Sequence, residues 1–225
     1  LLMDETGKIH KVVSKEYPLY FPQPGWSEQN PQDWIRQSME GIKELTAQCD
    51  KSQIKGISFG GQMHGLVVLD EKDQIIRPAI LWNDGRTGKQ TDYLNQEIGK
   101  ETLSRYTGNI AFAGFTAPKI LWMREKEPEN FARIGRIMLP KDYLAFYLSG
   151  EFSTDFSDAS GTLLLDVEHK CWSEEMMEIC GVRESQLPKL YESWEPTGAI
   201  KPEIAEELGI PQDVKIIAGA GDNAA

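Results

Sequence analysis

Short apolar runs alternate with segments of helical period along the whole chain, and this alternation restricts the folds open to it. The run at 214–218 is bounded by turn residues, which suits a buried strand. Residues 31–47 instead carry apolar side chains at helical spacing, namely Ile35, Met39, Ile42 and Leu45. Strands that alternate with helices indicate an α/β domain, and 225 residues are enough to bury its core.

Capping and turn residues set the expected boundaries of these elements. Asn30 is a good N-cap, and Pro31 suits the first position of the helix that follows. Residues 87–126 are mainly helical in character, with a helix start marked by Thr116 and Pro118. Further strands are expected at 54–59, 65–70, 75–82 and 136–139, and further helices at 141–148, 173–180 and 202–208.

Charge and composition exclude several classes of function. Acidic residues outnumber basic ones by 35 to 24, for a net charge of −11, whereas binding a nucleic-acid backbone needs a basic face. No apolar run approaches the roughly 20 residues that cross a bilayer. The widely spaced Cys49, Cys171 and Cys180 favour a reducing cytosol and give no metal site. We therefore expect a cytoplasmic protein without a nucleic-acid or membrane partner.

Three stretches carry polar groups where an α/β fold can bind ligands. The first, Gly60–Gly65, joins two apolar strands, and its glycines let the chain turn sharply and let a ligand approach the backbone. Gln62 and His64 within it can exchange hydrogen bonds with a ligand. A glycine-rich turn with a surface histidine is an equally good interpretation of this loop taken alone.

The second stretch, Ile80–Thr87, gathers polar groups where a strand ends and a helix begins. Open α/β sheets bind ligands at the carboxyl ends of their strands. The simpler interpretation, which this segment alone favours, is that Asn83 or Asp84 caps the helix.

The third stretch, Ala218–Ala225, runs from a buried strand through small residues to Asp222 and Asn223, and its last two alanines resemble the start of a helix. An aspartate on rigid backbone within reach of a substrate has the geometry of a general base. A helix N-cap is again the alternative. Asp142, Asp155 and Asp158 could join Asp222 in a Mg²⁺-binding cluster of a nuclease, but their spacing is generic and the net charge is unfavourable for DNA.

Together these stretches resemble the FGGY family of carbohydrate kinases. Any one of the matching segments would be weak evidence, whereas seven in the family's order, covering nearly the whole chain, are specific. They are Trp-Ser-Glu-Gln-Asn-Pro at 26–31, Gly-Gln-Met-His-Gly at 61–65, Ile80–Thr87, Gly-Phe-Thr-Ala-Pro-Lys at 114–119, Leu-Pro-Lys-Asp-Tyr-Leu at 139–144, Ser-Asp-Ala-Ser-Gly-Thr at 157–162 and Gly-Asp-Asn-Ala-Ala at 221–225.

The resemblance implies an actin-like, ribonuclease H-like ATPase domain that binds the sugar, with a second domain of similar fold completing the ATP site. It also implies that Asp222 deprotonates the sugar hydroxyl that attacks the γ-phosphate of Mg-ATP. Met63 and His64 would contact the sugar, and Asn223 would lie beside it. These roles agree with the chemistry, because phosphoryl transfer depends on positioning, charge stabilisation and a base that orients the nucleophile.

Within the family, the residues at this position vary with the sugar that is bound. The Gln-Met-His-Gly sequence at 62–65 resembles that of the members that act on xylulose. The expected reaction is ATP-dependent phosphorylation of D-xylulose to D-xylulose 5-phosphate. Kinases for ribulose, gluconate or glycerol are the nearest alternatives. A non-catalytic sugar-binding module is the alternative from another class.

The chain departs from the family's pattern at both ends. The first strand, with its Asp-x-Gly-Thr loop near the ATP phosphates, and the nucleotide-binding domain are both missing from the sequence. We therefore expect residues 1–225 to be an N-terminal sugar-binding domain that is truncated at both ends and inactive alone, and no ATP ligand is assigned within it. The oligomeric state stays open, with a homodimer as one candidate.

Overall fold

Strand β6 (Val67–Leu69) divides the interior into two hydrophobic cores in the computed structural model, which describes residues 1–225. Leu66 and Val68 pack into one cluster of buried side chains, whereas Val67 and Leu69 pack into the other. Successive side chains of a strand point to opposite faces, so a fully apolar strand can be buried on both sides. This explains why the segment reads as an unbroken apolar run.

The neighbours of β6 continue a small central sheet. Strand β8 (Arg136–Met138) pairs antiparallel with β6, and β7 (Ala79–Ile80) joins it through a bridge between Leu66 and Ile80. Strand β3 (Glu28–Gln29) pairs antiparallel with β7. Strands β6, β7 and β8 lie where the sequence predicts β structure but are shorter than expected, whereas β3 lies outside the predicted strands.

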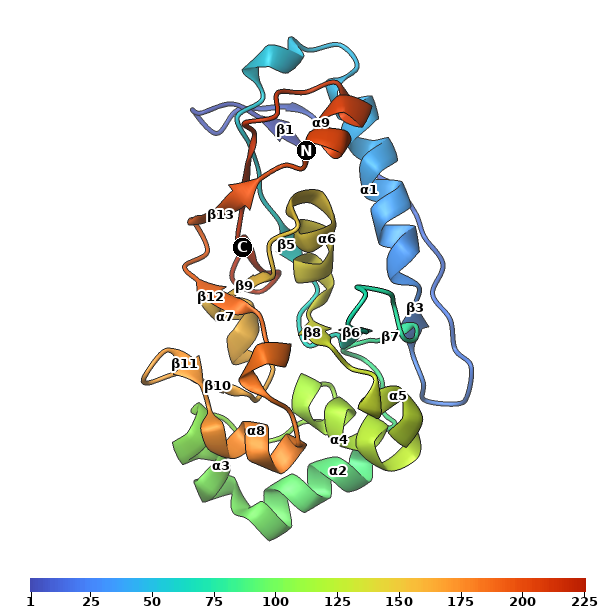
Figure 1. The fold of residues 1–225 in the computed structure, drawn as a ribbon, viewed down its shortest axis with the longest axis vertical. Helices are drawn as coiled ribbons and strands as arrows, with labels where there is room; N and C mark the ends of the chain where they lie inside the picture. The colour runs from blue at the N-terminus through green and yellow to red at the C-terminus, as the bar shows by residue number, and fades with distance from the viewer.

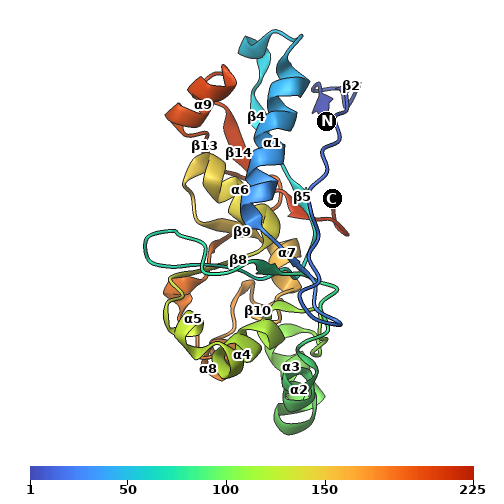
Figure 2. The same cartoon turned by 90° about the vertical axis from the view of Figure 1, so that its right-hand side faces the viewer.

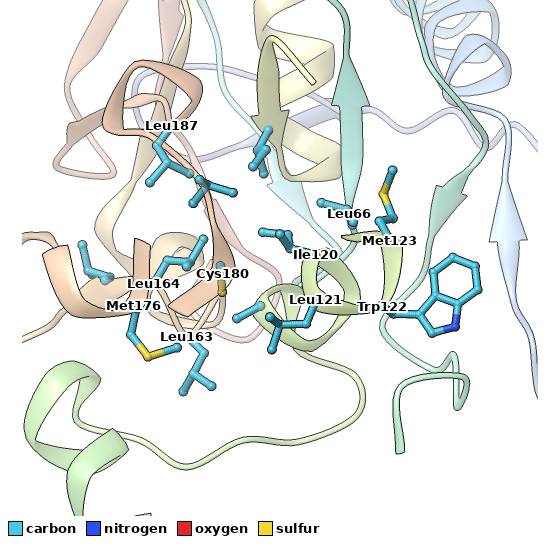
Figure 3. Packing of buried hydrophobic residues seen from close by; sticks show 14 of the residues in the cluster. Leu66, Ile120, Leu121, Trp122, Met123, Leu163, Leu164, Met176, Cys180 and Leu187 are labelled. Carbon is cyan, nitrogen blue, oxygen red and sulfur yellow. The ribbon is translucent and has the colours of Figure 1, made fainter. Parts of the chain in front are cut away.

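The first core is packed mainly by helices at the lower end of the molecule in Figure 1, together with the 163–165 segment. Helix α4 (Thr116–Lys126) begins at the predicted residue, and the side chains from Thr116 to Met123 are all buried. Figure 3 shows Ile120 and Leu121 directed toward Leu163 and Leu164. Helix α8 (Glu174–Cys180) adds Met176 and Cys180.

The second core lies beneath α1 (Pro31–Thr46), α6 (Pro140–Ser149) and α9 (Pro202–Leu208) at the opposite end (Figure 2). The α1 boundary confirms the prediction, since the Asn30 side chain accepts a hydrogen bond of 3.1 Å from the amide of Gln32. A proline at the start of each of these helices costs no hydrogen bond there.

Parallel strand pairs connect segments that are distant in the sequence. Strand β14 (Lys215–Ile217) lies parallel to β4 (Gly56–Ile57), and β15 (Ala220–Gly221) lies parallel to β5 (Gly60–Gly61). The end of the chain is thereby brought beside the Gly60–Gly65 loop, and the C-terminus lies close to β5 in Figure 2.

The remaining elements complete the α/β architecture. They are β1 (Leu2–Met3), β2 (Ile9–Lys11), η1 (Lys51–Gln53), α2 (Gly88–Asp92), η2 (Tyr93–Gly99), α3 (Lys100–Thr107), α5 (Pro128–Ala132), β9 (Ser153–Asp155), α7 (Phe156–Ser160), β10 (Leu165–Asp166), β11 (Cys171–Trp172), η3 (Glu184–Gln186), β12 (Lys189–Tyr191) and β13 (Pro196–Ala199). The helical stretch expected over 87–126 is interrupted after α3, where Gly108 takes a left-handed conformation and ends the helix. No helix is both long and apolar enough to span a membrane.

Candidate active site

The candidate site forms where β15 and β5 end side by side. The parallel register pairs Gly221 with Gly61, and the amide of Asp222 donates to the carbonyl oxygen of Gly61 at 2.8 Å. The residues that follow both strands, Gln62 and Asp222, therefore leave the sheet at the same edge. The carboxyl ends of strands are where α/β sheets bind ligands.

Asp222 is exposed, and its carboxylate forms no ion pair. A hydrogen-bonded turn holds the backbone around it, because the amides of Ala224 and Ala225 both donate to the carbonyl of Gly221, at 2.8 and 3.0 Å. The helix start expected at Ala224 is present only as this turn. A carboxylate on fixed backbone without a cationic partner is free to accept a proton from a bound molecule.

Met63 and Asn223 lie together on this edge. The Asn223 amide nitrogen is 3.8 Å from the Met63 sulfur, within range of a weak hydrogen bond. Met63 is packed against Gly221 so closely that a Cβ there would stand 2.7 Å from its Cγ. The half-buried thioether therefore forms an apolar wall beside Asp222.

His64 is held at one ring face and at one ring nitrogen. It has a positive φ of 67°, its ring stacks on Phe115 at 4.5 Å between centroids, and its Nδ1 lies 2.8 Å from the carbonyl oxygen of Gly161. A carbonyl can only accept, so Nδ1 carries the proton and Nε2 is left with a lone pair. Burial lowers the pKa of His64, and the nearby Lys119 charge acts in the same direction. The neutral ring can thus accept a hydrogen bond from a ligand hydroxyl through Nε2.

Lys119 and Thr116, at the start of α4, hold the backbone of His64. The Lys119 ammonium donates to the carbonyl of His64 at 2.8 Å and to that of Gly114 at 2.6 Å, and the Thr116 hydroxyl donates to the same His64 carbonyl at 3.1 Å. Burial lowers the pKa of Lys119 to about 7, while the Asp84 carboxylate opposes this shift. The sequence places both residues in a matching segment but does not identify this support of the loop.

The helix-cap interpretation of the second stretch is wrong for Asp84. The N-terminal residue of α2 is preceded by Thr87, which makes no side-chain capping bond. Asp84 is buried and instead pairs with Arg86, whose guanidinium stands 3.7 Å from the centre of the Trp26 ring. Arg86 also pairs with Glu28 at 2.7 Å, so this stretch forms part of a buried ion network.

Three aspartates that sequence spacing did not connect do gather in space. Asp142, Asp155 and Asp158 surround the buried ammonium of Lys141, at 2.7, 2.9 and 3.7 Å. The lysine occupies the position that a metal ion would need, and no group of three or more His, Cys, Asp or Glu side chains in the chain is arranged to hold a metal. Asp222 lies outside this ion cluster, at the exposed edge of the sheet.

Comparison with known proteins agrees with this arrangement. The model for the N-terminal domain of the FGGY family of carbohydrate kinases matches residues 1–225. The chain belongs to the FGGY family. It is 48% identical over 227 residues to a xylulose kinase of Lactococcus lactis, with all of this chain and 45% of that protein aligned.

Solved FGGY structures share the fold closely. A crystal structure of a xyloylose kinase from Brucella ovis superposes with a TM-score of 0.94 at 41% identity, covering 99% of this chain and 46% of that one. A gluconate kinase from Lactobacillus acidophilus gives the same TM-score at 31% identity, covering 99% of this chain and 45% of that one. These neighbours confirm the predicted actin-like α/β fold. The chain spans about half the length of the relatives that it matches.

Proposed function

We propose that this chain is the sugar-binding part of a kinase that transfers a phosphoryl group from ATP to D-xylulose. The observation that carries the proposal is the convergence of Asp222, Asn223, Met63 and His64 on one edge of the β5–β15 pair. Two loops that are about 160 residues apart in the sequence supply a base, a neutral hydrogen-bond acceptor and an apolar contact.

Asp222 acts as the general base in this proposal. Its exposed, unpaired carboxylate accepts the proton of a sugar hydroxyl as that oxygen attacks the γ-phosphorus of ATP and the bond to the β-phosphate oxygen breaks. His64 accepts a hydrogen bond from a neighbouring hydroxyl through Nε2, because Nδ1 is engaged with Gly161. The Asn223 amide and Met63 complete the contacts with the sugar.

ATP and Mg²⁺ are proposed as the other participants. Mg²⁺ usually keeps several waters and binds through one or two carboxylates together with substrate phosphates. This chain offers no preformed cage of three ligand side chains, so the ion would be held chiefly by the phosphates of ATP. When bound, it would neutralise charge on those phosphates, and we propose that most ATP ligands lie in protein outside residues 1–225.

The cytoplasm is proposed as the compartment, since the three cysteines are unpaired. Xylulose is favoured over other sugars because the xylulose kinase of Lactococcus lactis is 48% identical to this chain over the 227 aligned residues. Gluconate is the runner-up, since a gluconate kinase superposes equally well, although at 31% identity.

A substrate panel on the intact, full-length kinase tests the proposal. ATP consumption would be measured with D-xylulose, ribulose, gluconate and glycerol at matched concentrations. We expect the highest kcat/KM with D-xylulose. Clearly better turnover of another member of the panel would overturn the assignment of xylulose, and no sugar-dependent ATP consumption would favour a non-catalytic sugar-binding module.

A further inference from the structure

The ion cluster described above contains three carboxyl groups and one ammonium group, all shielded from solvent. Lys141, Asp142, Asp155 and Asp158 are each at most 3% exposed. Burial raises the pKa of Asp158 well above its ordinary value, and the charges of Asp142, Asp155 and Asp222 add to this, whereas Lys141 opposes it. The ammonium of Lys141 lies 2.7 and 2.9 Å from Asp142 and Asp155 but 3.7 Å from Asp158, so it is shared chiefly by the first two.

The second carboxylate oxygen of Asp155 binds hydroxyl groups rather than a cation. Its Oδ2 accepts hydrogen bonds from the amide of Ser157 at 2.9 Å, from the Ser157 hydroxyl, and from the Ser193 hydroxyl at 2.8 Å. The Lys141 pair and hydroxyl donors lower the pKa of Asp155 despite its burial. An ionised carboxylate with this many partners is held in one orientation, and it fixes the Ser157 hydroxyl with it.

The Ser157 hydroxyl connects this cluster to the candidate base. Because Ser157 donates its proton to Asp155, its oxygen is left to accept, and it accepts from the amide of Gly221 at 3.2 Å. Gly221 directly precedes Asp222 and closes the turn that follows it. No other side chain hydrogen-bonds to the backbone of residues 220–225.

A second connection reaches the same backbone through β5. The side chain of Lys141 lies against Gly61, where an added Cβ would stand 2.6 Å from the Cβ of Lys141. Gly61 in turn accepts the amide hydrogen bond of Asp222. The two successive peptide groups that precede the Cα of Asp222 are therefore linked to one buried cluster, the first through Ser157 and the second through Gly61.

We propose that Ser157, fixed by Asp155 and Lys141, is a positioning residue that holds the backbone of Asp222 in place for proton transfer. Ser157 does not contact the sugar in this proposal and acts only through Gly221. The inference rests on the proposed function, since it assigns Asp222 as the base. Misplacing a reacting group by about 1 Å can cost on the order of 100-fold in rate, so one lost backbone contact is large enough to detect.

The test compares Ser157→Ala with Ser160→Ala in the intact kinase. Ser160 lies on the same short helix, and its hydroxyl donates to the carbonyl of Ser157 without reaching Gly221. We expect Ser157→Ala to lower kcat by about 10- to 100-fold with the KM for sugar nearly unchanged. Hydrogen exchange of the Gly221 amide should become faster in this variant, whereas Ser160→Ala should change none of these quantities.

Two isosteric variants of Ser157 distinguish the loss of its hydroxyl from a general loss of folding. Ser157→Thr keeps the hydroxyl and Ser157→Val removes it at the same shape, so the threonine variant should retain much more activity than the valine variant. Equal kcat values in this pair, or an unchanged exchange rate at Gly221 in Ser157→Ala, would overturn the proposal. If Asp222→Asn kept full activity, the proposed function would fail instead, while the exchange rate would still report whether Ser157 holds Gly221.

Discussion

The imidazole of His64 and the carbonyl of Gly161 lie 2.8 Å apart, although 97 residues separate them in the sequence. This contact fixes the proton on Nδ1 and leaves Nε2 to accept a hydrogen bond from a ligand. It also joins two of the segments that match the FGGY family, the Gly-Gln-Met-His-Gly loop and the Ser-Asp-Ala-Ser-Gly-Thr segment.

Adding a methyl group at Gly161 should displace the His64 ring. A Cβ at this position would stand 2.6 Å from both Nδ1 and Cε1 of the imidazole. We expect Gly161→Ala to weaken sugar binding by about five- to tenfold, as for the loss of one hydrogen bond of about 1 kcal/mol. Isothermal calorimetry with xylulose on the intact kinase measures this. Gly88→Ala is the control, because nothing lies within 4 Å of its Cβ, and equal affinities for the two variants would refute the expectation.

The histidines should titrate in a defined order. Burial lowers the pKa of His64, whereas the hydrogen bond and charge of Asp166 raise the pKa of His169. In an NMR titration of the ring protons, His64 should therefore take up its proton at a lower pH than His169. A His64→Gln variant assigns the resonance, and a reversed order would contradict the environment described here.

The same shift has a consequence for stability. The folded state binds a proton at His64 less readily than the unfolded state, whose pKa is about 6.5. The contribution of His64 to the free energy of unfolding should thus be constant above about pH 6.5 and should fall as the pH drops below it. Urea unfolding of the wild type and His64→Gln across this range would show the difference, and parallel curves for the two proteins would contradict it.

Lys119 should matter for both stability and sugar binding. It is fully buried and donates to the carbonyls of His64 and Gly114, so Lys119→Met leaves the Gly114 carbonyl without this donor and the His64 carbonyl with only the Thr116 hydroxyl. We expect a loss of about 1–3 kcal/mol in the free energy of unfolding, together with weaker sugar binding as the His64 backbone loosens. Lys126→Met, on the exposed end of the same helix, should stay within about 0.5 kcal/mol of wild type. Similar unfolding curves for the two variants would argue against the role of Lys119.

Arg86 should not tolerate replacement by lysine. Its guanidinium pairs with Asp84 and Glu28 and stacks on Trp26, and a lysine reproduces neither the fork of donors nor the flat face. We expect Arg86→Lys to lower the free energy of unfolding by several kcal/mol, on the order of the cost of breaking a buried ion pair. Urea denaturation monitored by tryptophan fluorescence measures this. Arg105→Lys, at an exposed site on α3, serves as the control, and a near-wild-type curve for Arg86→Lys would be the contrary result.

Local signals in the sequence determined much of the fold. Asn30 and Pro31 mark the start of α1 because capping depends on residues that are adjacent in the chain. The family resemblance placed Asp222, Met63, His64 and Asn223 in one site, and the pairing of β15 with β5 brings them to one edge.

Contacts between segments that are distant in the chain could not be predicted from local sequence signals. The sequence around Asp84 suggests a helix cap because only neighbouring residues are visible in it. The partners of Asp84 in the fold are set by tertiary contacts, and one of them is the amide of Ser27, 57 residues away in the sequence. Asp155 and Asp158 looked generic because only folding brings Lys141 between them. Lys119 gave no functional signal, since its acceptors are backbone carbonyls that carry no side-chain pattern.

The most direct test of the account is the Asp222→Asn variant of the intact kinase, with kcat and sugar affinity measured separately. Asparagine keeps the size and the backbone contacts of Asp222 but cannot take the proton from the sugar. We predict that kcat falls by about 100- to 10,000-fold while the dissociation constant for xylulose changes by less than about threefold. A kcat close to that of the wild type would contradict the assignment of Asp222 as the base.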